Sequence, residues 1–386
     1  MKRALIMIVA LGAALVCSDA GAGAGAGAGG GGGRGGVPRP ARHVDGAPLP
    51  ASVEASSALG LADDNTVVGA AVAEGEAQFP VVWRYGTDAG VRPPVIAGHY
   101  GGEAAAIGAG GDVAGEFMTE DRFTVPVRWR PGDDGLVEMD TLGGAFSHVT
   151  AMNAGGVAAG VADAEDGGFR AVRWDGSGAI TDLGTLHDDD ESGALGINDA
   201  GVVVGQSGQS SLRGAAVRWD PDGTVTELPL PAGMETGAGR AVNRAGVIVG
   251  EAVPGDEQIS TADPVGDAVR WDADGTVSRL PVPGGGTAVA AGINDSGTVV
   301  GVARRPGGPV RPVRWSPDGT CTDLNLLPGS VTGAAHAINN RGYAAGVSID
   351  AEGDHHAVLW HPDGSVTALD RHSNHTVLPS PPASGR

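Results

Sequence analysis

The sequence predicts an all-β fold, a single seven-bladed β-propeller built from seven four-stranded repeats of about 45 residues. Three observations predict it. Every one of the seven tryptophans ends a segment such as "AVRW", with valine two residues earlier. A "VVG"-like segment precedes each tryptophan at a nearly constant interval. Glycine accounts for 68 of 386 residues and aromatic residues for only 4%, which is typical of short strands and turns and not of long helices.

The repeat is regular in its spacing. The glycine of the "VVG"-like segment and the following tryptophan are 14 residues apart in six copies and 21 in the fifth, and the next such glycine follows after 30 to 32 residues. The tryptophans are Trp83, Trp129, Trp174, Trp219, Trp271, Trp315 and Trp360. Helical periodicity is absent, which argues against a helical solenoid. Each copy therefore predicts a four-stranded antiparallel meander.

The first turn of each copy is exemplified by "INDAGVVVG" at residues 197–205. We expect its turn glycine to adopt the left-handed conformation that closes a three-residue hairpin with a bulge. Asparagine tolerates positive φ better than other non-glycine residues, and it occupies one of the seven positions. The occupants are Asn65, Gly111, Gly156, Gly201, Gly246, Gly297 and Gly342. A second turn, such as "DPDGT" at residues 220–224, separates the third and fourth strands.

The core and the closure of the ring follow from the same pattern. Valine and tryptophan at i and i+2 share one face of a strand, so we expect one tryptophan per blade to pack between neighbouring blades. The stretch "APLPAS" at residues 47–52 resembles "LPLPAG" at residues 228–233. It therefore competes with "SVTALD" at residues 365–370 for the outer place in the last blade, and the sequence leaves that choice open.

The chain divides into four segments. Residues 1–20 have the basic start, short apolar run and small-residue cleavage site of a signal peptide, and the apolar run is too short to span a membrane. Residues 21–45 form a Gly-rich flexible linker, residues 46–371 the propeller and residues 372–386 a C-terminal tail. We expect a secreted, extracellular protein, with lipidation at Cys17 as the alternative.

After cleavage of the signal peptide, Cys321 is the only cysteine, so no intramolecular disulfide is expected.

The net charge of −21 excludes nucleic acids and anionic membranes as expected partners, because phosphate groups would be repelled. The sequence contains no expected transmembrane segment, and we expect a monomer. The partner is expected to be an extracellular protein or polysaccharide of unknown identity.

The chain resembles the HAF-repeat family of bacterial extracellular proteins. The segment "ITDLGTLHDDDESGALGINDAGVVVGQS" at residues 180–207 carries the "DLGTL", "A-IN--G" and "VVG" elements of that family in order. The sequence departs from the family pattern before the tryptophan, where most copies read "AVRW" or "PVRW" and "HAVLW" at residues 356–360 is closest to the family's His-Ala-Phe. The resemblance implies a secreted or surface-associated repeat protein and no defined activity.

Binding is expected on one particular face of the propeller. On this face lie the connections between the second and third strands of each blade and the connections that lead from each fourth strand to the next blade. These connections are longer and more varied than the other turns, and variable loops on a repeated scaffold commonly carry recognition. We call this the long-loop face and the opposite end the short-turn face. The candidate partner-binding residues are Asp121, Phe123, Phe169, Arg170, Arg213, Arg304, Arg311, His355 and His356.

Signals for catalysis are weak, and we expect no enzyme, no cofactor and no metal site. Neither G-x-S-x-G nor H-E-x-x-H occurs. The acidic run "HDDDES" at residues 187–192 lacks the spacing of a calcium loop, and the histidines between residues 355 and 375 are expected to be incidental. Two alternatives remain open. One is a polysaccharide-acting lyase or hydrolase, with its acid and base drawn from Asp121, Asp166, His187 or His355. The other is a structural component of the cell surface.

Overall fold

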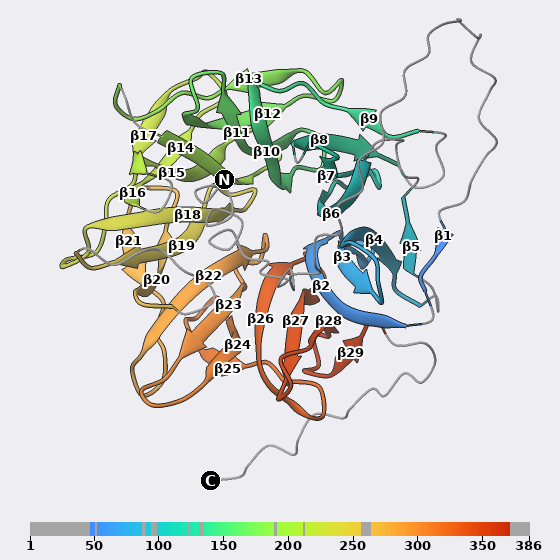
Figure 1. Ribbon diagram of the computed structural model, residues 1–386. Coiled ribbons are helices and arrows are strands. Elements are labelled where there is room, and N and C mark those ends of the chain that lie inside the picture. The colour runs from blue at the N-terminus through green and yellow to red at the C-terminus, as the bar shows by residue number, and fades with distance from the viewer. Residues whose placement is uncertain are drawn as a thin grey trace, which may run out of the picture.

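The computed structural model describes residues 47–50, 52–86, 90–93, 99–121, 123–130, 135–188, 191–210, 213–255 and 264–370. The expected signal peptide, the whole of the expected linker and the C-terminal tail lie outside these residues. The described chain forms seven antiparallel sheets arranged as the blades of a propeller, which confirms the predicted fold (Figure 1). None of the described segments is a helix with the length and apolarity needed to cross a membrane.

Each of the first four blades is a meander whose strands follow chain order. Blade 1 consists of β2 (Val53–Leu61), β3 (Thr66–Ala73), β4 (Phe79–Arg84) and β5 (Gly90–Arg92). Blade 2 consists of β6 (His99–Ile107), β7 (Val113–Thr119), β8 (Thr124–Trp129) and β9 (Val137–Glu138). Blade 3 consists of β10 (Gly143–Met152), β11 (Ala158–Ala164), β12 (Phe169–Trp174) and β13 (Ile180–Asp182). Blade 4 consists of β14 (Glu191–Ile197), β15 (Val203–Ser210), β16 (Arg213–Trp219) and β17 (Val225–Glu227).

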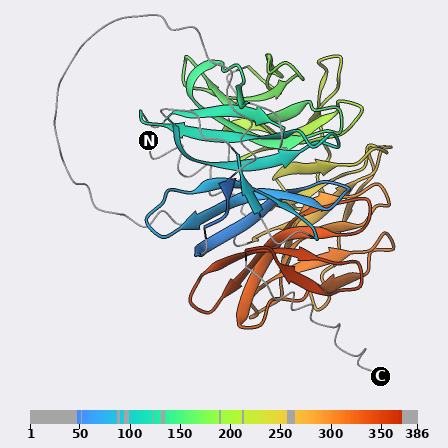
Figure 2. The same cartoon turned by 90° about the vertical axis from the view of Figure 1, so that its right-hand side faces the viewer.

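The last three blades repeat this order. Blade 5 consists of β18 (Thr236–Val242), β19 (Ile248–Val253), β20 (Asp267–Trp271) and β21 (Val277–Arg279). Blade 6 consists of β22 (Thr287–Ile293), β23 (Val299–Arg304), β24 (Val310–Trp315) and β25 (Cys321–Asp323). Blade 7 consists of β26 (Ser330–Ile338), β27 (Ala344–Asp350), β28 (His355–Trp360) and β29 (Val366–Ala368). The first strand of each blade contacts the first strands of its neighbours, so these seven strands surround the axis; Figure 2 shows the ring from the side.

The tryptophans pack between blades, as the sequence predicts. All seven are at most 4% exposed, and the indole N–H groups of five donate to backbone carbonyls of the preceding blade or of the segment that leaves it. Trp271, for example, donates to the carbonyl of Pro229 at 2.6 Å. Each such contact buries a large ring and satisfies its polar end. The core is thus a set of interblade layers, one per tryptophan.

The glycine of the "VVG" segment has a role that the sequence pattern does not predict. The first strand of each blade has an irregularity in its pairing opposite this glycine, for example between Ala194 and Gly196. This irregularity brings a carbonyl oxygen of the first strand against the glycine, and a Cβ on Gly205 would lie 1.9 Å from the oxygen of Gly193. The glycine is therefore required because the two backbones approach each other closely.

The turn residues predicted to be left-handed do have positive φ, from 70° at Asn65 to 83° at Gly297.

The ring closes without a shared blade. β1 (Ala47–Pro48) pairs with β5 and becomes a fifth strand of blade 1, while β29 (Val366–Ala368) takes the outer place in blade 7. Both contenders identified in the sequence are therefore used, each in its own blade. Blades 7 and 1 are joined by side-chain contacts such as the 2.9 Å hydrogen bond from Ser56 to Asp370.

Candidate functional site

The residues proposed from the sequence for partner binding lie at the connections between the second and third strands of five different blades. Asp121 and Phe123 share the turn between β7 and β8, and Phe123 is 46% exposed. In blade 3, Phe169 is only 9% exposed and packs edge-on against Phe146. Arg170 lies beside it and forms an ion pair with Asp166 at 3.7 Å. The buried ring of Phe169 thus belongs largely to the core.

The remaining proposed residues do not gather at one place either. Arg213 begins β16, and the position of its side chain lies outside what the structure describes. Arg304 and Arg311 lie on the paired strands β23 and β24. His355 and His356 begin β28, and His356 is held by Asp370 at 3.0 Å and Asp350 at 3.4 Å. Of the seven connections between second and third strands, which were expected to be long, five are hairpins of four or five residues, because the strands continue into them.

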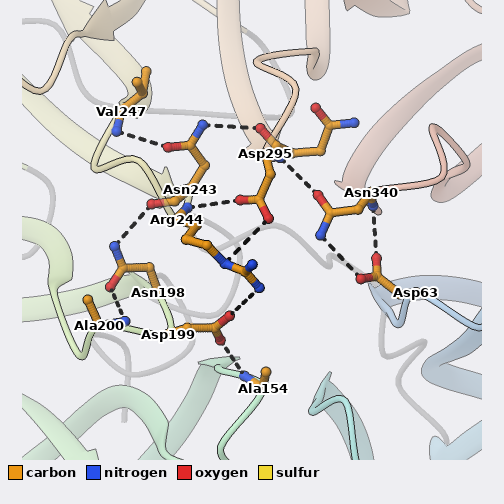
Figure 3. A network of polar contacts seen from close by, with 11 residues as sticks. Asp63, Ala154, Asn198, Asp199, Ala200, Asn243, Arg244, Val247, Asp295 and Asn340 are labelled. Atoms are coloured by element: carbon orange, nitrogen blue, oxygen red, sulfur yellow. Dashed lines mark hydrogen bonds and ion pairs between the residues drawn. The ribbon is translucent and has the colours of Figure 1, made fainter.

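On the short-turn face, a chain of asparagines links the blades around the axis. The side-chain oxygen of Asn243 accepts from the backbone N–H of Val247 in its own turn, and its amide nitrogen donates to the carbonyl of Asn294 in the next blade. Asn198 donates to Asn243 in the same way, as Figure 3 shows. The residues that donate across blades are Asn153, Asn198, Asn243, Asn294 and Asn339. Blades 1 and 2 have Ala62 and Gly108 at this position, so the chain of donors is interrupted there.

The residues that follow these asparagines form a polar rim around a cavity of about 170 Å³ at the axis. In Figure 3 the guanidinium of Arg244 lies between Asp199, at 3.2 Å, and Asp295, at 3.8 Å. Asp63 accepts from both the backbone and the side chain of Asn340. These charged groups already satisfy one another, so the rim stabilises the ring and leaves little free chemistry for a ligand.

A larger cavity, about 490 Å³, opens on the same face between blades 1 and 2. We call it the blade-1/2 groove. Its lining residues are Asp64, Thr66, Arg84, Tyr85, Ile107, Gly110, Gly111 and Arg130. Tyr85 is 44% exposed and is held from the other side by Tyr343 and His361. The groove thus presents an aromatic ring and two guanidinium groups to solvent.

Blade 2 also contains a buried group of titratable residues, which we call the Glu–Glu–His cluster. Glu103 on β6 and Glu116 on β7 are direct partners in the antiparallel register. His148, on β10 of blade 3, places its Nδ1 at 2.6 Å from Oε1 of Glu116. The three residues are 7%, 7% and 8% exposed, and one possible ligand atom from each lies within 4.8 Å of the others.

The electrostatics of the Glu–Glu–His cluster are unusual. Burial, reinforced by the charge of Glu116, raises the pKa of Glu103 to about 7. Burial alone would lower the pKa of His148, but attraction to Glu116 and a hydrogen bond with it prevail and raise that pKa to about 9. These shifts favour a protonated carboxyl group on Glu103 beside a charged imidazolium on His148.

Sequence reasoning missed this cluster because its members belong to no motif and lie in three strands of two repeats. A comparison of the repeats could have found it. At the position after the "VVG" glycine, the other blades have Ala70, Val161, Gln206, Glu251, Val302 and Val347. Blade 2 alone combines a glutamate there with a second glutamate at the facing position. The signal is a departure from the repeat, visible once the strand register is known.

Comparison with known proteins supports the fold. No protein-family model matches the sequence, and no curated protein matches it. Among solved structures, the β-propeller domain of the Trilobed protease from Pyrococcus furiosus, described as having an open velcro topology, is similar at a TM-score of 0.55 with 12% identity. The alignment covers 87% of this chain and 98% of that domain.

Two further similar structures are enzymes. Puromycin hydrolase is similar at a TM-score of 0.53 and 15% identity, and the Pyrococcus horikoshii acylaminoacyl peptidase at 0.52 and 13%. Each alignment covers 82% of this chain and 53% of the enzyme, so this chain spans about half their length. At such identities the likeness establishes the fold alone. The expectation that the chain is not an enzyme is nevertheless corrected, because enzymes are among the proteins that share its propeller.

Proposed function

We propose that this chain is an exported β-propeller that binds an anionic saccharide in the blade-1/2 groove. The observation that carries the proposal is the lining of a 490 Å³ cavity by Tyr85, Arg84 and Arg130. That volume is within the range of about 300–1,000 Å³ typical of small-molecule sites. The signal-like residues 1–20 support export, and the HAF-like repeat is consistent with an extracellular role. The groove lies on the face opposite to the one favoured by sequence alone.

The charge of the groove supports an anionic ligand. The chain as a whole has a net charge of −21, yet the groove is lined by two arginines and one aspartate. Behind Arg130, Asp112 is shared with Arg128, at 2.9 and 3.6 Å respectively, so this carboxylate faces two guanidinium groups. Guanidinium groups bind carboxylates through paired hydrogen bonds. The exposed ring of Tyr85 offers an apolar face to the C–H groups of a sugar.

The test is calorimetric titration of a uronic-acid oligosaccharide into the chain and two matched variants. Gly110→Phe places an aromatic side chain in the groove. Gly155→Phe makes the same change at the equivalent turn position of blade 3. Neither glycine has positive φ, and a Cβ at either site meets its nearest atom at 3.4 Å or more. We expect Gly110→Phe to weaken binding at least tenfold and Gly155→Phe to leave it unchanged. Equal affinities for both variants would refute the groove as the site.

A second candidate function, hydrolysis or lysis of polysaccharide, is favoured by the Glu–Glu–His cluster. A carboxyl group with a pKa of about 7 beside another glutamate has the proton affinity that acid–base catalysis requires. The residues first considered for this role are Asp121, Asp166, His187 and His355, and among the described residues no hydrogen bond or ion pair joins any two of them. New reducing or unsaturated ends, formed by the wild type and lost in Glu103→Gln, would establish this activity. Their absence would leave binding as the function.

A further inference from the structure

We propose that the Glu–Glu–His cluster binds a divalent transition-metal ion, with Glu103, Glu116 and His148 as its ligands. Carboxylate oxygens and an imidazole nitrogen form the mixed donor set that suits Zn²⁺ and Mn²⁺. The inference goes beyond the proposed saccharide groove and does not depend on it. The groove opens at the short-turn face, whereas the cluster lies midway along β6, β7 and β10.

The first argument is convergence. One donor atom from each residue lies within 4.8 Å of the other two. Donors around one zinc ion, at bond lengths of about 2.0–2.2 Å, are separated from each other by about 3–4 Å. Side-chain adjustment alone can close that difference. The strand register holds Glu103 opposite Glu116, so the ligand set does not depend on a loop.

The second argument is charge. Like charges directly opposite on paired strands destabilise a sheet, and burial increases the penalty. Blade 5 shows how the fold otherwise handles a buried carboxylate, because Glu251 is paired there with the guanidinium of Arg240 at 2.6 Å. In the part of the chain that the structure describes, no arginine forms an ion pair with Glu103 or Glu116, and His148, at 2.6 Å from Glu116, is the one cationic partner. A divalent cation that displaced the imidazolium proton would bind both carboxylates and a neutral imidazole, and its two charges would balance those of the carboxylates.

The third argument is orientation. The side-chain amide of Gln78 donates to Oε2 of Glu103 at 3.1 Å, and the backbone N–H of Val149 donates to Oε2 of Glu116 at 3.4 Å. Each carboxylate is therefore oriented through its Oε2, as the supporting groups around a metal site commonly orient their ligands, while Oε1 of Glu116 faces the imidazole of His148. All three residues are buried, with 7–8% of their surface exposed. Three protein ligands leave a coordination position for water or substrate, as in catalytic zinc sites.

His356 provides a contrast within the same molecule. It too lies between two carboxylates, but Asp370 contacts its Nδ1 and Asp350 its Nε2. The two acids are thus at opposite ring nitrogens and cannot share one ion with the same imidazole nitrogen. A histidine with two acidic neighbours is therefore not sufficient, and His356→Gln is a suitable control.

The test is titration of Zn²⁺ alone into the full, metal-stripped chain by calorimetry, with thermal unfolding of the same samples. We expect one site in the wild type that is at least tenfold weaker in Glu103→Gln and Glu116→Gln and unchanged in His356→Gln. The groove variant Gly110→Phe should bind Zn²⁺ like the wild type, which separates this proposal from saccharide binding. Zn²⁺ should raise the melting temperature of the wild type and not that of Glu103→Gln.

The thermal stability of the metal-free cluster variants also tests the proposal. Glutamine preserves the volume of Glu103 while removing one of two facing acids, so the metal-free Glu103→Gln chain should melt no lower than the wild type. If it melts lower, His148→Gln provides the same binding test from the other blade. Wild-type chain without a saturable site up to millimolar Zn²⁺, or equal affinity in the wild type and the cluster variants, would overturn the proposal.

Discussion

Gly205 and Gly193 approach each other so closely that a Cβ on Gly205 would lie 1.9 Å from the carbonyl oxygen of Gly193. We therefore predict that Gly205→Ala destabilises the chain by more than about 4 kcal/mol, because the first two strands of blade 4 must separate to accommodate the methyl group. Gly201→Asn in the same blade is the control. Asn65 occupies the equivalent turn position with φ of 70°, so this change should cost no more than about 2 kcal/mol. Guanidinium unfolding measures both, and similar losses would contradict the distinction.

The tryptophans provide a matched pair for the interblade hydrogen bond. Trp271 donates to the carbonyl of Pro229 at 2.6 Å, whereas the buried indole N–H of Trp83 has no hydrogen-bond partner among the described residues. Both changes to phenylalanine remove the same atoms from buried positions. We predict that Trp271→Phe costs about 1–2 kcal/mol more than Trp83→Phe, because only the former leaves a carbonyl unpaired. Equal changes in the free energy of unfolding would show that ring packing alone decides the outcome.

The Glu–Glu–His cluster makes stability depend on pH. The pKa of Glu103 is about 7 in the folded chain against an ordinary value of 4.5, so the folded state is penalised increasingly as pH rises from 4.5 to 7. The pKa of His148 is about 9 against 6.5, so its stabilising contribution is complete below pH 6.5 and is lost as pH rises through 9. Both effects act in the same direction, with a slope of up to about 1.4 kcal/mol per pH unit for each group.

We therefore predict that the free energy of unfolding, measured in EDTA, falls between pH 5 and pH 9. Glu103→Gln removes one titrating group, so the difference between variant and wild type isolates the contribution of that carboxyl. The decline between pH 5 and 7 should be shallower in the variant. A parallel profile in both proteins would mean that Glu103 ionises normally in the folded state.

The propeller architecture was predictable from the sequence because all seven copies of the repeat share the same pattern of strands and turns. Trp219 and its six counterparts mark the interblade layers, and Asn65 at a glycine position confirms the left-handed turn. The site was harder to predict, because its residues are exceptions to the repeat. Glu103 and Glu116 are 13 residues apart in sequence, and only the strand register makes them neighbours. The blade-1/2 groove is formed by side chains of two neighbouring blades, and the spacing of residues in the sequence does not predict where those side chains lie.

Among the described residues, the junction between blades 7 and 1 is made by packing and by side-chain hydrogen bonds between two complete blades, including those of Ser56 with Asp370 and of Asn339 with Ala62. None of the described strands is exchanged across it, so each repeat supplies the four strands of its own sheet. A duplication or deletion of one whole repeat in the gene would therefore leave every remaining blade intact and alter only the curvature required to bring the two ends together. The molecule is thus a closed array of complete four-stranded units, in which the number of blades can change without interrupting any one sheet.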